Sequence, residues 1–119
     1  YYGITVPNFP NLFCLYGPNT NVNGNASLVL LSEAGAMYIV ECIRLLLESG
    51  KRGMEVRQEV LERFNQRIDA ASGSVVYGAA TVKSWYKNSS GRLTQNWPLP
   101  TVEYWKETRK VNKDDYLFL

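Results

Sequence analysis

The chain has 119 residues, 45% of them hydrophobic, with 13 basic and 11 acidic side chains and no histidine. This length supports one hydrophobic core rather than two. The mixed charges, with a formal net charge of +2, provide no strong positive field for nucleic-acid or membrane-surface binding. Without histidine, the commonest general base and metal ligand are both missing, so we expect no metal site.

The two cysteines, Cys14 and Cys42, lie in apolar runs and lack the CxxC spacing of redox or zinc motifs. We interpret them as small buried thiols rather than a disulfide. The sequence opens without a signal peptide or transit sequence, which favours a reducing, cytoplasmic setting. It opens at Tyr1 rather than at an initiator methionine, within what resembles a strand or loop, so we expect a piece of a longer protein.

The first predicted element is a short strand at residues 12–16, which are continuously apolar and bounded by Pro10 and Gly17. Such a run fits a strand that is buried on both faces. Residues 19–25 then hold four asparagines and a glycine, which tolerate positive φ and predict a shaped loop. A strand, a polar turn and a helix N-terminus together favour an anionic or electron-rich ligand, because unpaired N–H groups and the positive end of the helix dipole face it.

Residues 26 to about 49 form the longest predicted element, a helix with apolar side chains on nearly every face. Such a helix is either a core helix or a membrane span. We favour a core helix because Glu33, Glu41 and Arg44 fall inside the window, and each charge costs about 2.5 to 3.5 kcal/mol at a bilayer centre. The two glutamates are too far apart along one helix to converge on one atom, so they form no catalytic pair.

Capping residues mark the ends of this helix: Asn25 or Ser27 suits its start and Gly50 its end. The pattern then predicts a short strand at 54–58 and an amphipathic helix at 60–72. In the last third, we predict short strands at 75–77 and 82–86, a hairpin turn at 88–91, a return strand at 93–97 and a brief helix at 101–109. Together these elements predict an α+β fold.

Aromatic residues crowd the C-terminal third and alternate with basic ones. They are Tyr77, Trp85, Tyr86, Trp97, Tyr104 and Trp105. Such a mixture suits stacking on bases, sugars or a nicotinamide dinucleotide phosphate, or it simply fills the core of a small layer. The sequence shows no nucleophile with its base, so it assigns no catalytic residue.

Four blocks of sequence together resemble one enzyme family. They resemble, in the same order, the C-terminal end of class B flavoprotein monooxygenases. The blocks are FPNLFCLYGPNTN with SEAGAMYIVECI, then MEVRQEVLERFNQRID, VKSWYKNSSGRLTQNWP and YWKETRKVNKDDY. Within that class the chain looks most like the Baeyer-Villiger type, in particular the 4-hydroxyacetophenone monooxygenase branch. The resemblance covers essentially the whole chain.

The resemblance implies that residues 1–50 close an FAD-binding domain and that residues 51–119 form a cap on the nucleotide-binding domains. It also implies a set of cofactor-binding residues. They are Gly17, Pro18, Asn19, Thr20, Asn21, Asn25 and Trp85. In the family, the first six match the loop against the flavin, and the tryptophan matches a segment near NADP and the substrate cleft.

The full-length enzyme implied by the resemblance uses FAD and NADPH to insert one oxygen atom from O2 into a ketone or heteroatom substrate. The chain has no GxGxxG turn for a dinucleotide. We therefore expect it to bind no cofactor and to be inactive alone, to depend on upstream FAD- and NADP-binding domains, and to self-associate when separated from them. One alternative is a stand-alone aromatic-rich module for carbohydrate or a protein partner. A nucleic-acid binder, whose affinity would fall steeply with salt, is the third.

Overall fold

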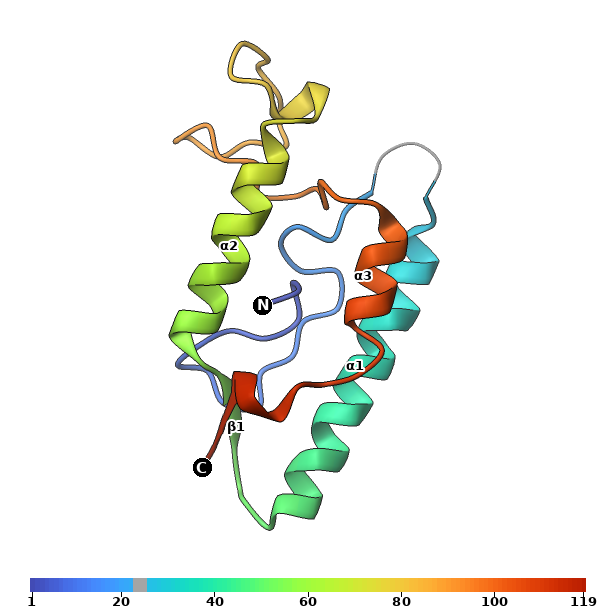
Figure 1. Cartoon of the computed structure of the whole chain (residues 1–119), viewed down its shortest axis with the longest axis vertical. Coiled ribbons are helices and arrows are strands. Elements are labelled where there is room, and N and C mark those ends of the chain that lie inside the picture. The colour runs from blue at the N-terminus through green and yellow to red at the C-terminus, as the bar shows by residue number, and fades with distance from the viewer. Residues whose placement is uncertain (23–25) are drawn as a thin grey trace.

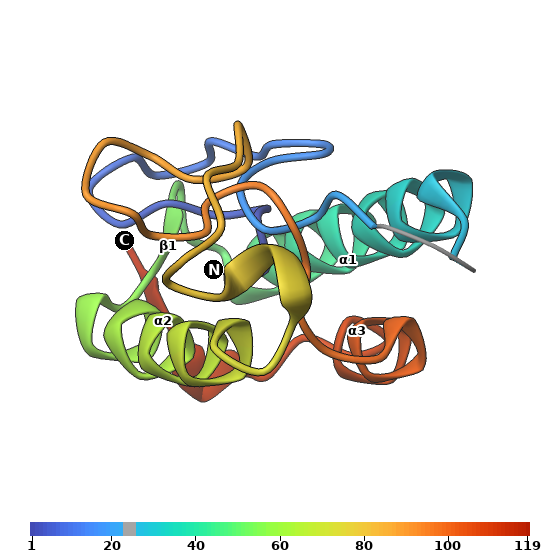
Figure 2. The same ribbon diagram turned by 90° about the horizontal axis from the view of Figure 1, so that it is seen from above.

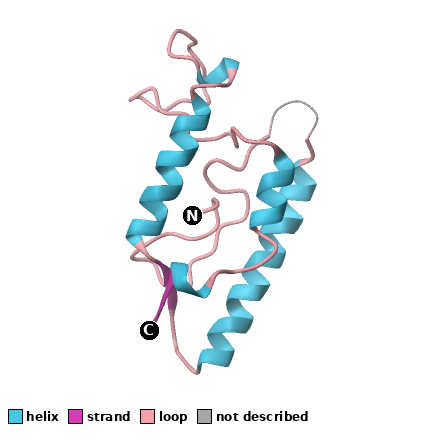
Figure 3. Cartoon of the chain, viewed as in Figure 1, coloured by secondary structure: helices cyan, strands magenta, loops and turns pink. Residues whose placement is uncertain are grey.

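The computed structural model describes residues 1–22 and 26–119. Within them the fold is α+β, as predicted. Its elements are the helices α1 (Leu28–Ser49), α2 (Gln58–Ser72) and α3 (Thr101–Glu107), the short 3-10 helices η1 (Val76–Gly78) and η2 (Lys113–Asp115), and the strands β1 (Met54–Val56) and β2 (Tyr116–Phe118). Loops make up much of the rest (Figure 3). In Figure 1, α1 and α2 stand on opposite sides of the view with the N-terminal segment between them.

Helix α1 confirms the long predicted helix and its caps. The Ser27 hydroxyl accepts a hydrogen bond from the Leu30 N–H at 3.3 Å, and Gly50 ends the helix in the left-handed conformation with φ of 66°. One face is buried in the chain's own core, through Leu31, Ala34, Gly35, Tyr38, Cys42 and Leu45. The opposite face is just as apolar but exposed, through Val29, Met37, Val40 and Leu47. No helix in the described ranges is long and apolar enough to cross a membrane.

The buried strand predicted at residues 12–16 is wrong. The segment makes only an isolated bridge between Phe13 and Thr5, supported by the Cys14 N–H donating to the Ile4 carbonyl at 2.8 Å. Leu15 is 59% exposed, and Leu12 and Tyr16 are exposed as well. A strand buried on both faces needs neighbouring strands and two covering layers. Within the described residues this segment has neither, so Leu12, Leu15 and Tyr16 are exposed and only Phe13 packs partly against the core.

The elements after α1 are mostly as predicted. Strand β1 and helix α2 are confirmed, and α2 buries Val60, Phe64, Ile68 and Ser72 at helical spacing. Strand β2 was not predicted from the sequence. It pairs antiparallel with β1 in the register Met54 to Phe118, forming a two-stranded sheet. Helix α3 confirms the brief helix predicted at 101–109, although it ends at Glu107.

The strands predicted at 75–77 and 82–86 are also wrong. Residues 76–78 form the 3-10 helix η1, whereas residues 82–84 are irregular and residues 85–86 form a turn. The hairpin turn at 88–91 is confirmed, because the Gly91 N–H donates to the Asn88 carbonyl at 2.9 Å. The return strand at 93–97 is reduced to two isolated bridges, Leu93 with Lys87 and Asn96 with Asn21. Short apolar runs become strands only where a partner strand lies beside them.

Aromatic side chains dominate the core. The ring of Tyr2 lies 5.7 Å from that of Tyr38 and 5.1 Å from that of Phe64, between α1 and α2. Trp97 and Tyr104 are 5.1 Å apart, and the Tyr104 hydroxyl donates to the Tyr2 carbonyl at 3.0 Å. These rings join both ends of the chain into one cluster. Two aromatic residues of the C-terminal third, Trp97 and Tyr104, therefore fill the core.

Buried hydroxyl and thiol groups predict lower stability at alkaline pH. Cys42 is a free, fully buried thiol, and burial raises its pKa from 9.0 to about 12. Burial also raises the pKa of Tyr38, Tyr104 and Tyr116. Because the pKa of each of these groups is higher in the folded state than in the unfolded state, their contribution to folding stability is fully present below about pH 9. It falls above that pH by up to about 1.4 kcal/mol per pH unit for each such group.

Urea unfolding between pH 7 and 11 measures this effect. We expect a constant free energy of unfolding up to about pH 9 and a steep decline above it. A Cys42→Ala variant, which lacks the thiol, should begin from lower stability and decline less steeply between pH 9 and 10. A wild-type free energy that stays level to pH 11 would contradict the prediction.

Candidate functional site

The predicted Gly17–Asn21 loop lies beside a distant segment, residues 94–97. The Asn19 N–H donates to the Thr94 carbonyl at 3.0 Å, and the Asn21 N–H donates to the Gln95 carbonyl at 2.9 Å. The Trp97 N–H donates back to the Asn21 carbonyl at 2.8 Å. In the view from above, the N-terminal loops and the segment before α3 lie on the same side of the molecule (Figure 2).

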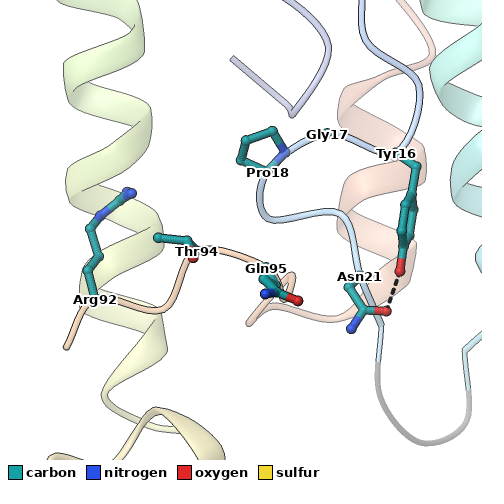
Figure 4. Close-up of a pocket in the computed structure, with 7 residues that line it drawn as sticks. All are labelled: Tyr16, Gly17, Pro18, Asn21, Arg92, Thr94 and Gln95. Carbon is teal, nitrogen blue, oxygen red and sulfur yellow. Dashed lines mark hydrogen bonds between the residues drawn. The ribbon is translucent and has the colours of Figure 1, made fainter. Parts of the chain in front are cut away.

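A pocket of about 500 Å³ opens where these two segments meet. One wall carries Tyr16, Gly17, Pro18 and Asn21, and the other carries Arg92, Thr94 and Gln95 (Figure 4). The Tyr16 hydroxyl donates to Asn21 Oδ1 at 2.7 Å, which fixes the orientation of that side chain. Three of the predicted cofactor-binding residues, Gly17, Pro18 and Asn21, therefore line one pocket.

Asn19 and Thr20 turn inward and hold the wall together. Asn19 is 4% exposed, and its Nδ2 donates to the carbonyls of Leu93 and Asn96 at 3.1 and 3.0 Å. The Thr20 hydroxyl donates to the Gly17 carbonyl at 2.7 Å. Neither residue lines the 500 Å³ pocket. Their side chains shape the backbone of the loop.

Trp85, another predicted site residue, does not line this pocket. Asn25 lies outside the described residues. Trp85 is 71% exposed, with its ring centroid 4.3 Å from that of Tyr86, and it is absent from the pocket lining. It lies on the loop between η1 and α3, where the Gln95 side-chain amide donates to its carbonyl at 3.1 Å.

Arg92 supplies the charge of the pocket. Its Nε donates to both carboxylate oxygens of Asp69 at 2.8 and 3.1 Å, and its Nη2 donates to Asn65 Oδ1 at 3.2 Å. Both partners belong to α2, so the ion pair ties the pocket wall to that helix. Sequence reasoning missed Arg92, Thr94 and Gln95 as pocket residues. The predicted return strand contained the last two, but nothing in the sequence indicated that its partner was residues 19–21.

A fully buried side-chain amide lies in the segment that pairs with the Gly17–Asn21 loop. Asn96 is 0% exposed, and within the described residues neither Oδ1 nor Nδ2 of its side chain has a hydrogen-bond partner. An unpaired buried polar group costs about 1 to 3 kcal/mol. Asn96 is the bridge partner of Asn21, which places this unmet hydrogen-bonding capacity directly beside the pocket wall. Among the described residues, no cluster of acidic and cysteine side chains could hold a metal ion.

Curated proteins align with nearly the whole chain. It is 36% identical to the FAD-binding monooxygenase ktnD of Aspergillus niger, over 98% of this chain and 20% of that protein. It is 33% identical to Baeyer-Villiger monooxygenases of Streptomyces coelicolor and Pseudomonas aeruginosa, over 98% of this chain and 22% of each. Its homologues are flavin-dependent monooxygenases. The chain spans about a fifth of the length of these relatives. No family model and no solved structure matches the chain.

Proposed function

We propose that the chain is the C-terminal part of an FAD- and NADPH-dependent monooxygenase of the Baeyer-Villiger type, in the 4-hydroxyacetophenone monooxygenase branch. The complete enzyme inserts one oxygen atom from O2 into a ketone or heteroatom substrate. The observation that carries the proposal is the alignment of 98% of this chain with about a fifth of one FAD-binding monooxygenase and of two Baeyer-Villiger monooxygenases. Residues 1–50 close the FAD-binding domain, and residues 51–119 cap the nucleotide-binding domains.

The 500 Å³ pocket provides the flavin-facing wall in this proposal. Gly17 and Pro18 present backbone without bulky polar side chains, while Asn21 and Gln95 supply hydrogen-bond donors. Such donors fit the carbonyl oxygens and ring nitrogens of a flavin. When bound, FAD supplies the electron transfer and oxygen activation. The residues of this chain orient the ring and exclude water from one side.

The exposed apolar surface supports the place of this chain in a larger protein. Exposed apolar side chains lie on the outer face of α1, including Met37 and Leu47, and at Leu12 and Leu15 of the N-terminal loop. Within the described residues, the N–H groups of Leu15 and Tyr16 donate to no backbone carbonyl. Large exposed apolar patches mark interaction surfaces. We infer that the upstream domains of the same polypeptide cover this surface, and that the separated chain self-associates through it.

Expression of two proteins tests the proposal. We expect the 119-residue chain to purify colourless and to leave NADPH unoxidised. A polypeptide extended to the length of its relatives should retain FAD and oxidise NADPH in the presence of O2. A stoichiometric yellow complex of the short chain would refute the claim that it is incomplete. A full-length gene without a dinucleotide fingerprint upstream would refute the enzyme.

The aromatic pair Trp85 and Tyr86 favours a second candidate function, a stand-alone binding module for carbohydrate or a protein partner. Trp85 and Tyr86 offer adjacent rings, and Trp85 is largely exposed. In the monooxygenase, we propose that Trp85 contacts NADP or the substrate instead. An open reading frame that begins just before Tyr1 would support the module, whereas one about five times longer would support the enzyme.

A further inference from the structure

Arg92 lies between two pockets rather than one. Besides the 500 Å³ pocket, it lines a second pocket of about 230 Å³ between the N-terminal loop and α2. Pro18 also borders both. Among the described residues that line these pockets, Arg92 carries the only charged side chain. Neither lining includes a carboxylate, and the Asp69 carboxylate that pairs with Arg92 lies outside both linings.

The guanidinium group of Arg92 is held in place from behind. Asp69 accepts from Nε and Asn65 accepts from Nη2, and these two residues stand one turn apart on α2. No hydrogen bond within the described residues uses Nη1. A planar guanidinium whose rotamer is already fixed binds a carboxylate or phosphate with little further loss of entropy.

Neutral donors surround the same space. Asn21 and Gln95 offer side-chain amides, and Thr94 offers a hydroxyl. We propose that Arg92 binds an oxyanion, a phosphate or carboxylate group of a small ligand, at the mouth shared by these two pockets. In the enzyme proposed above, on which this assignment rests, the oxyanion comes either from a phosphate of the nicotinamide cofactor or from a carboxylate of the substrate.

The competing explanation is that Arg92 only ties the pocket wall to α2 through Asp69. Arg67 provides a matched control. It is also an arginine of similar exposure, paired with the carboxylates of Glu103 and Glu107, but it lines neither pocket. Replacing either arginine by glutamine removes one positive charge and its surface ion pairing, with Asp69 for Arg92 and with Glu103 and Glu107 for Arg67. Only Arg92→Gln removes a charge from the proposed oxyanion site.

Calorimetric titration of the 119-residue chain at constant ionic strength tests the proposal, with pyrophosphate as the phosphate probe and benzoate as the carboxylate probe. We expect at least a tenfold weaker Kd for the preferred probe in Arg92→Gln and a change of less than twofold in Arg67→Gln. The preferred probe identifies the source of the oxyanion. Equal affinity of Arg92→Gln and wild type, or an equal loss in Arg67→Gln, would overturn the assignment, as would the absence of binding by wild type.

Circular dichroism checks that each variant keeps its helices. If Arg92→Gln unfolds, Arg92→Lys replaces it: the charge stays but the planar fork is lost, and we expect a three- to tenfold weaker Kd. Wild-type affinity in a folded Arg92→Lys would then overturn the proposal. The extended polypeptide separates this test from that of the proposed function. If that polypeptide is yellow while the oxyanion titration fails, only the Arg92 assignment falls.

Discussion

Replacing Gly17 with alanine is expected to destabilise the chain by about 3 kcal/mol or more. A Cβ atom at this position would lie 2.2 Å from the carbonyl oxygen of Gly3 and 3.2 Å from Cys14 Cβ. Because the obstacle is backbone, no side-chain rotation relieves the overlap. The two segments must separate, which moves the wall of the 500 Å³ pocket. Urea unfolding of wild type and Gly17→Ala measures the loss.

Gly35→Ala is the matched control for this prediction. Gly35 is buried in the middle of α1, but its nearest neighbours to an added Cβ lie at 3.7 to 3.9 Å, an ordinary contact distance. Alanine also has a higher helix propensity than glycine, by about 1 kcal/mol. We therefore expect Gly35→Ala to be neutral or stabilising. Equal stabilities of Gly17→Ala and wild type would show that the close approach of Gly3 and Gly17 is not required.

Asn19→Ala is expected to cost about 2 to 4 kcal/mol. The substitution removes two side-chain hydrogen bonds, to the carbonyls of Leu93 and Asn96, in a site that is 4% exposed. It also places alanine at a φ of 60°, which asparagine tolerates better. In the complete enzyme the same change should lower flavin retention, because it loosens the pocket wall. Absorbance of the retained flavin and urea unfolding together test whether the loss of stability and the loss of flavin accompany each other.

Asn21→Ala distinguishes the role of this loop in stability from its role at the surface of the pocket. Asn21 is only partly buried, and its side chain bonds the exposed Tyr16 hydroxyl, so we expect less than about 1 kcal/mol of destabilisation. If Asn21 faces the flavin, its loss should alter the flavin spectrum or retention without unfolding the protein. The structural explanation of Asn19 would be contradicted if Asn19→Ala matched wild type in stability while losing flavin.

Local signals in the sequence were enough to predict the helices. The periodicity of apolar residues located α1 and α2, and Ser27 and Gly50 marked the ends of α1 through capping chemistry. The turn at 88–91 followed from its asparagine and glycine. These elements depend on residues within a few positions of each other, which a linear pattern records directly.

Strands and pocket walls depend on residues that are distant in the sequence. For these features the sequence predictions were wrong or were not made. Residues 12–16 have a strand-like pattern, but the described chain offers no sheet to receive them. Residues 116–118 form β2 because β1 lies beside them, although the run is too short to predict. A ligand site at residues 17–21 was predicted from the polar turn before a helix and from the resemblance to a family. Its second wall, which includes Arg92, became evident only from hydrogen bonds that span more than 70 residues.

Helix α1 carries two kinds of sequence constraint at once. Its inner face, with Tyr38 and Cys42, keeps this chain folded, and its outer face, with Met37 and Val40, contributes nothing to that core. A polar substitution on the outer face should therefore leave the stability of the isolated chain almost unchanged. In the enzyme proposed above, selection among homologues against such a substitution would measure the contact of this face with the upstream domains. A comparison of substitution rates on the two faces of one helix would thus report how an assembly, and not only a fold, limits the evolution of this segment.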